Sequence, residues 1–291
     1  MMILPQLLKL YGDTSKAFGL GAAICAGIGF VFCLLHYFWT QERKVPASTS
    51  EAEKIKLGDI FLVFKNNRAF VALCIHGICI CCMQYVGATL GTYMYADVLG
   101  DIGIMSLSSA ISMPLGIASL IIAPLLAKKF GLEKTIRTCL LLASALYMGL
   151  FIAHCTFAVS PWVHLIWSAI ATGLGSISIY MQWGLVAEVI DYNEMISGKR
   201  TEGSIYGTFN LSRRIGQTVG NSAAVLALGW IGYQAGAATQ TAGTILGIKA
   251  LCVLVPGVFI IGSWIAFKFV WNITPEVRAK MAEHKALSKA E

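Results

Sequence analysis

The sequence predicts an all-α, polytopic membrane protein with about seven transmembrane helices and an N-terminal stub. The first observation is the composition: of 291 residues, 57% are hydrophobic and 13% are charged, whereas soluble domains carry roughly 25% charged residues. The second is that the apolar residues form long stretches, close to the roughly 20 residues that a helix needs to cross a bilayer. So few charges could not cover a soluble surface, which excludes a soluble globular enzyme, a disordered chain and a coiled coil.

The apolar stretches define the expected spans in chain order. A piece at residues 1–10 comes first; it is too short to cross a bilayer and is similar to the end of a helix whose beginning is missing. Each later stretch is long enough to span with some tilt. These stretches cover residues 18–39, 70–95, 104–127, 136–157, 162–187, 204–231 and 245–271.

One long hydrophilic connection separates the first of these stretches from the rest. Residues 40–69 are rich in Lys, Glu and Ser and contain Pro46. This composition is typical of a linker. The apolar residues around positions 57–64 predict one short amphipathic helix within it.

The distribution of Lys and Arg predicts the orientation in the membrane. The chain has 22 Lys and Arg against 15 Asp and Glu, a net charge of +7. Lys and Arg accumulate in cytoplasmic connections, and alternate connections are basic, while those near residues 96–103, 158–161 and 233–244 contain none. One orientation fits every connection: the linker and the C-terminal tail are cytoplasmic. The excess positive charge therefore indicates orientation and not a nucleic-acid partner.

This orientation places residue 1 on the outer side of the membrane or in the outer part of a helix. A chain without a signal peptide rarely begins there. We therefore expect upstream helices to be absent from this sequence, with an outward start as the alternative.

A polar stripe marks the stretch at residues 204–231. Its members recur at helical spacing on an otherwise apolar helix: Tyr206, Asn210, Arg213 or Arg214, Gln217 and Asn221. Facing lipid, such a stripe would cost several kcal/mol, so we expect it to face water, substrate or a partner helix. A cavity lining is favoured over a purely structural network between helices.

A second candidate lies near one end of the preceding stretch, where Tyr180, Gln182 and Trp183 follow one another closely. Aromatic rings that stack on a sugar, together with amides and Arg that bond its hydroxyls, are what a sugar site needs. Ordinary packing or an interfacial aromatic belt remains the alternative for each residue.

The remaining polar residues in the apolar stretches give weaker signals. The histidines show no pairing pattern, which favours packing or helix-end roles over a proton relay: His36, His76, His154 and His164. Lys249 is equally compatible with snorkelling to the interface and with a functional role. The cysteine run Cys79-x-Cys81-Cys82 has no histidine or carboxylate at zinc-site spacing, so packing is favoured and no metal site is predicted.

An acidic signature stands between the fifth and sixth complete helices. Glu188, Asp191 and Glu194 are spaced three residues apart, roughly on one helix face. Arg200 and Glu202 follow in the same short cytoplasmic turn. A solvated loop is the plain interpretation. The spacing also predicts a gate of ion pairs that form and break when helix bundles rock against one another.

These residues together resemble the glycoside–pentoside–hexuronide:cation symporters, the melibiose-permease-like branch of the major facilitator superfamily. The resemblance covers essentially the whole chain and rests on these motifs: Glu188-x-x-Asp191-Tyr192-x-Glu194, Gly198-x-Arg200-x-Glu202-Gly203, Arg213-Arg214-x-Gly216-Gln217, Gly247-Ile248-Lys249, Pro256, Thr40-x-Glu42-Arg43 and Asn67-Arg68.

The resemblance implies the C-terminal part of a twelve-helix major facilitator fold. Residues 1–39 would be the end of the N-terminal bundle, with part of helix five and helix six, and residues 40–69 the cytoplasmic linker. Residues 70–271 would form the C-terminal six-helix bundle, and residues 272–291 a cytoplasmic tail. The implied protein is a sugar:cation symporter of the bacterial inner membrane that uses a proton or sodium gradient, and not an enzyme.

The resemblance also implies residue roles. Arg214 falls where the family has a basic residue facing the sugar and cation cavity, and Tyr180 and Trp183 lie in the region where it has an aromatic beside the sugar. Glu188, Asp191, Glu194, Arg200 and Glu202 match its cytoplasmic gate. The carboxylates that bind the coupling cation lie on early helices of the family, so no residue here takes that role. Implied partners are a sugar or glycoside, the cation, the bilayer and the missing N-terminal helices; no cofactor is expected.

Two other interpretations stay open. The chain could be a membrane fragment or accessory half that does not transport by itself. It could also belong to a facilitator-type transporter of another solute, because this fold hosts many substrates.

Overall fold

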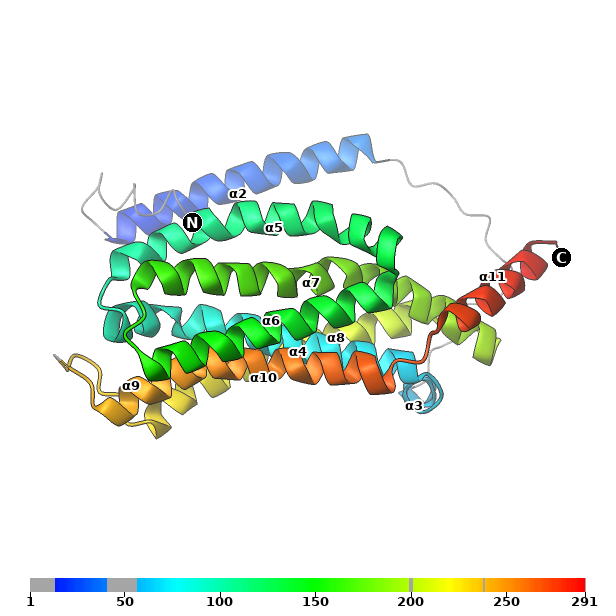
Figure 1. Ribbon diagram of the computed structural model, residues 1–291. Coiled ribbons are helices and arrows are strands. Elements are labelled where there is room, and N and C mark those ends of the chain that lie inside the picture. The colour runs from blue at the N-terminus through cyan, green and yellow to red at the C-terminus, as the bar shows by residue number, and fades with distance from the viewer. Residues whose placement is uncertain (1–13, 41–56, 199–200, 238, 291) are drawn as a thin grey trace. The chain divides into compact units, whose positions relative to one another are not determined.

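The computed structural model describes residues 14–40, 57–198, 201–237 and 239–290, and every regular element among them is helical (Figure 1). The chain divides into two units, residues 1–54 and residues 55–291. The first contains α2 (Thr14–Trp39), and the second contains all later helices. The apolar stub expected at residues 1–10 and most of the linker lie outside the described residues. The helix expected near residues 57–64 is confirmed as α3 (Leu57–Asn66).

Six helical stretches of the described chain are long and apolar enough to cross a membrane. They correspond to six of the seven expected spans: α2 from Phe18, α4 with the π-helical η1 (Arg68–Val98), α5 (Ile102–Phe130), α6 (Leu132–Thr156), α7 (Pro161–Ser197) and the last span (Ala242–Val270). The last span consists of α9 (Ala242–Lys249), η2 (Ala250–Leu254), α10 (Val255–Ile265) and η3 (Ala266–Val270).

The seventh expected span forms α8 (Glu202–Trp230), which is long enough at 29 residues but more polar than the others. Its polarity comes from the stripe that the sequence places on one of its faces. The opposite face packs closely on α4, where Gly216 is required: a Cβ at this position would lie 2.5 Å from the carbonyl oxygen of Ile78. Small residues of this kind allow helix backbones to approach in membrane bundles.

α4 is the central helix of the second unit. Phe70, Leu73 and Leu90 on it are fully buried, and Cys81 and Cys82 are buried against α8. The Cys82 thiol donates a hydrogen bond to the Gly216 carbonyl, at 3.2 Å. The cysteine run therefore serves as small packing residues between two helices, as the sequence favoured.

α7 extends well past the thickness of a bilayer. Its 37 residues reach about 55 Å at 1.5 Å per residue, compared with a hydrocarbon core of about 30 Å. Ser160 caps its beginning, and Gly198, with φ of 66°, ends it. The acidic signature, expected at a helix end that leads into a short turn, lies on the last turns of this helix, which continues past the expected end of the span at residue 187.

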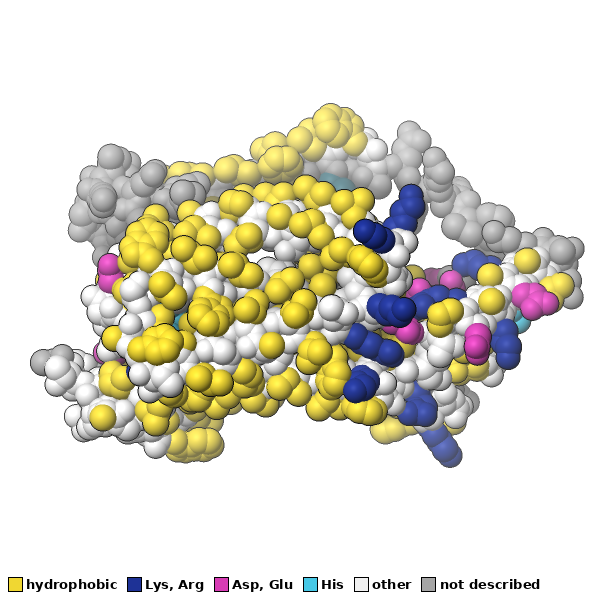
Figure 2. Space-filling view, viewed as in Figure 1, with side chains coloured by type: hydrophobic (Ala, Val, Ile, Leu, Met, Phe, Trp, Pro, Cys, Tyr) yellow, Lys and Arg dark blue, Asp and Glu magenta, His cyan; other side chains and the backbone are white. Residues whose placement is uncertain are grey.

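Most of the basic residues of the second unit gather at one end. Figure 2 shows hydrophobic side chains over the middle of the visible face and Lys and Arg at the end where α11 (Pro275–Ala290) emerges. The ends of several helices contribute these cations: Lys65, Arg68, Lys128, Lys129, Arg137 and Lys268. The tail expected after residue 271 is thus largely helical.

Candidate functional site

The polar stripe of α8 lies on an open face of the second unit. Tyr206 is 50% exposed, and Arg214 and Asn221 are also exposed. Arg214 donates a hydrogen bond to the Gln217 side chain at 2.9 Å, one turn further along the same helix. The Asn210 amide donates to the Tyr206 carbonyl at 3.0 Å. Most of the stripe is thus held in place by its own helix and presents polar groups outward.

Arg213 and Arg214 have different surroundings because successive residues on a helix point about 100° apart. Arg213 is half-buried, and its guanidinium lies 5.3 Å from the centre of the Trp183 ring of α7. The Trp183 ring also packs against Tyr206 at 5.8 Å and Phe209 at 5.7 Å. One cation and a group of rings therefore join α7 to α8 beside the polar stripe.

The candidate residues of α7 divide between two faces of the helix. Trp183 is 41% exposed and Tyr180 is 37% exposed, and they are three residues apart on one face. The Tyr180 hydroxyl lies close to α5, since a Cβ at Gly116 would be 3.4 Å from it. Gln182 is 1% exposed and lies in the interior of the unit. The two rings can therefore contact a solute on the open face, whereas the Gln182 amide cannot.

The acidic signature on α7 is paired with the C-terminal helix. The Arg278 guanidinium donates to both oxygens of Glu188, at 3.1 and 3.0 Å, and also lies 3.8 Å from Glu133 of α6. Lys285 of α11 pairs with Asp191 at 3.1 Å. These contacts join α11 to the first turn of α6 and to the C-terminal part of α7.

Sequence reasoning missed the basic partners of this network. Arg278 and Lys285 are seven residues apart, which is two helical turns, so the spacing itself could have matched them to an acidic face. Glu202 begins α8, and Glu194 lies in the last turn of α7. Arg200 lies outside the described residues.

Two histidines form a pair that the sequence did not predict. His154 Nε2 and His164 Nδ1 are 2.9 Å apart, because the short connection between α6 and α7 brings the last turn of one helix against the first turn of the next. Lys249 donates to the His154 carbonyl at 2.9 Å. Its ammonium is therefore turned into the protein at the end of α6, where a cation is favourable.

A comparison with known families decides the class of this protein. Residues 1–274 match the family described as MFS/sugar transport protein. The chain belongs to this family. As a member of the MFS/sugar transport protein family, it belongs to a family of multi-pass membrane transporters.

This chain is similar to several individual proteins, each at low sequence identity. An uncharacterized symporter of Bacillus subtilis is 25% identical over 97% of this chain and 60% of its own length. The glucuronide carrier protein homolog of Escherichia coli is 29% identical over 85% of this chain and 52% of its own length. A putative sulfoquinovose importer of Escherichia coli is 24% identical over 95% of this chain. The chain spans a little over half the length of these relatives.

Proposed function

We propose that the chain is the C-terminal part of a sugar:cation symporter that works by alternating access. In this proposal residues 1–39 end an N-terminal bundle, residues 40–69 link the bundles and residues 70–271 form the C-terminal six-helix bundle. Family membership supports transport. The open polar stripe of α8 beside the exposed rings of α7 supports a solute site on this bundle.

The observation that carries the site is the cluster of Arg213, Trp183 and Tyr206 next to Asn210, Arg214 and Gln217. Trp183 or Tyr180 would stack on the apolar face of a sugar ring, while the amides and Arg214 would hydrogen-bond its hydroxyls. A stripe of this polarity is unfavourable against lipid, and its exposure on the second unit supports water or a solute in front of it rather than a purely structural network.

We further propose that the sugar carries an anionic group. Two relatives are named for glucuronide and sulfoquinovose, whose carboxylate and sulfonate are both negatively charged. Arg213 and Arg214 supply guanidinium groups, which bind planar and tetrahedral oxyanions through paired hydrogen bonds. The Gln217 contact orients Arg214 without neutralising it.

The coupling cation, a proton or sodium, is assigned mainly to the N-terminal helices. Such a cation needs a carboxylate at depth in the membrane. Among the described helices from α4 to η3, the acidic residues lie near the helix ends, at positions such as Asp97, Asp101, Glu133 and Glu188.

The acidic end of α7 is proposed to act as a gate, with Glu188, Asp191, Glu194, Arg200 and Glu202 as its members. Rocking of one bundle against the other requires ion pairs that can form and break, and the pairs of Glu188 and Asp191 with α11 support the view that this end of α7 makes such contacts. The basic residues at this end support a cytoplasmic location of the gate and of the C-terminus, in a bacterial inner membrane.

Uptake competition tests the anionic sugar. We expect a labelled glucuronide to be taken up by cells that express this chain together with an N-terminal half from a relative, and unlabelled sulfoquinovose to compete. The neutral glucoside of the same aglycone is the matched control and should compete at least tenfold less well, the usual minimum for losing a charge-assisted hydrogen bond. Equal competition by the neutral glucoside would reject the anionic assignment, and uptake of neither class would reject sugar transport.

A further inference from the structure

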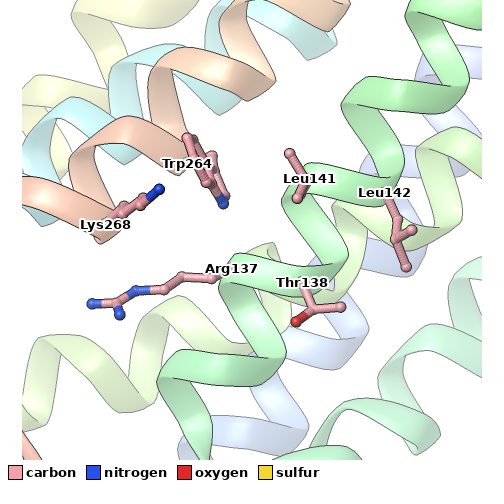
Figure 3. Close-up of a pocket in the computed structure, with 6 residues that line it drawn as sticks. All are labelled: Arg137, Thr138, Leu141, Leu142, Trp264 and Lys268. Carbon is pink, nitrogen blue, oxygen red and sulfur yellow. The ribbon is translucent and has the colours of Figure 1, made fainter.

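A groove of about 270 Å³ lies between α6 and the last span. Arg137, Thr138, Leu141 and Leu142 line it from α6, and Trp264 and Lys268 line it from α10 and η3 (Figure 3). None of these residues belongs to the polar stripe or to the contacts with α11 described above. The groove is therefore a feature that the transport site does not explain.

The two helices that form the groove run antiparallel. Arg137 Nε donates to the Phe267 carbonyl at 2.8 Å near the beginning of α6, and the Ser144 hydroxyl donates to the Gly257 carbonyl at 3.2 Å further along. Arg137 is four residues before Leu141, and Lys268 is four residues after Trp264. Because the helices are antiparallel, this spacing places both cations at the same end of the groove.

The walls of the groove beyond the cations are apolar and face outward from the bundle. Leu141 and Leu142 are 49% and 50% exposed on a helix that spans the membrane. The Trp264 ring lies across the gap from Leu141 (Figure 3). This part of the surface suits an acyl chain, and a tryptophan at this depth is typical of the membrane interface.

Arg137 near the beginning of α6 and Lys268 in η3 belong to the basic end of the bundle, where lipid headgroups would lie. Lys268 Nζ lies 4.6 Å from the centre of the Trp264 ring and 5.1 Å from that of Phe269, so the ammonium is held against the groove wall. The Arg137 guanidinium is oriented by the Phe267 carbonyl through Nε, and its Nη2 lies 4.0 Å from the Glu133 carboxylate. The guanidinium has five N–H donors, so beyond the Phe267 bond and the Glu133 pair it can still donate to a phosphate.

We propose that this groove binds an anionic phospholipid, with its phosphodiester between Arg137 and Lys268 and an acyl chain against Leu141, Leu142 and Trp264. Basic pockets between transmembrane helices at a charged membrane face recognise such headgroups. A soluble anion would make no use of the apolar wall. The proposal depends on membrane insertion and not on the transported solute.

Native mass spectrometry of the full chain in a neutral detergent, titrated with phosphatidylglycerol, tests this assignment. We expect phosphatidylglycerol to bind more tightly than phosphatidylcholine of the same chains, and Lys268→Gln to weaken it about fivefold, as one Lys near a phosphate should. Lys268 is exposed and contacts ring faces, so this variant should fold. Arg137→Lys, which keeps the charge but loses the guanidinium, should weaken binding less than Lys268→Gln.

Lys129→Gln is the matched control. Lys129 is also exposed at the basic end and also lies over an aromatic ring, Phe130 at 5.2 Å, but it does not line the groove between α6 and the last span. It should leave phosphatidylglycerol binding unchanged, and millimolar inorganic phosphate should not compete. Equal losses in both glutamine variants, equal binding of the two lipids, or displacement by inorganic phosphate would each overturn the lipid assignment.

Discussion

Arg213 and Arg214 are adjacent in the sequence, but their side chains make different contacts. Arg213 is part of the contact between α7 and α8 through the Trp183 ring, whereas Arg214 bonds to Gln217 of its own helix and is exposed. Removing Arg213 therefore changes helix packing. Removing Arg214 should change only what the open face can bind.

We therefore expect Arg214→Ala to lower uptake about 10- to 100-fold in the assembled transporter, since a hydrogen bond to a charged group is worth about 1.5–3 kcal/mol. The amount of protein in the membrane should not change. The measurement is initial uptake rate, normalised to inserted protein, with Arg214→Lys as a partial rescue. Near-normal uptake by the alanine variant would remove Arg214 from the site.

The sequence could predict which polar residues of α8 lie on one face, because the helical period alone decides this. Tyr206, Asn210, Arg214 and Gln217 follow this rule. The burial of Gln182 could not be predicted, because it depends on which neighbouring helix covers that side of α7. The pairing of His154 with His164 likewise depends on how tightly α6 turns into α7.

At the scale of elements, the close contact between α4 and α8 depends on the absence of a side chain at Gly216. A Cβ at Gly216 would lie 2.5 Å from the Ile78 carbonyl oxygen and 2.9 Å from its Cα, and backbone cannot move aside cheaply. Gly216→Ala should therefore destabilise the bundle by about 1–3 kcal/mol through overpacking. This opposes the gain of up to about 1 kcal/mol that alanine normally brings to a helix.

Gly207→Ala on the same helix provides the control, because a Cβ at that position has nothing within 4 Å. Thermal unfolding in detergent should show a lower midpoint for Gly216→Ala and an unchanged or higher midpoint for Gly207→Ala. Equal midpoints would mean that α8 does not approach α4 as closely as the structure has it.

The helices themselves were largely predictable, because each apolar stretch needs its backbone groups satisfied inside the membrane and a helix does this locally. Two features of the helices could not be predicted from the sequence. α7 continues to Ser197 because helix propensity, and not hydrophobicity, governs its acidic end. The last span contains the π-helical η2 just before Pro256, a residue whose missing N–H interrupts the regular ladder.

At the scale of the whole molecule, α11 connects the C-terminal tail to the ends of α6 and α7, and its ion pairs differ in exposure. Lys285 is 55% exposed and lies 3.1 Å from Asp191, and such exposed pairs are worth about 0–1 kcal/mol. Arg278 and Glu188 are each 28% exposed and form a two-point contact, and Arg278 also lies 3.8 Å from Glu133. The contact between Arg278 and Glu188 should therefore stabilise the proposed gate more than the contact between Lys285 and Asp191.

We accordingly expect Arg278→Gln to shift the balance between inward- and outward-facing states several-fold more than Lys285→Gln, which removes the same charge from the same helix. A loss of about 1–2 kcal/mol corresponds to a change of about 5- to 30-fold in the ratio of the two states. Alkylation of Asn210→Cys from each side of the membrane measures the ratio, in a background without reactive native cysteines. Glu188→Gln should reproduce the effect of Arg278→Gln, because either change breaks one pair. Unchanged labelling in all three variants would exclude a gate at α11, and equal shifts in the two α11 variants would mean that net charge at this end, rather than the Glu188–Arg278 contact, sets the balance.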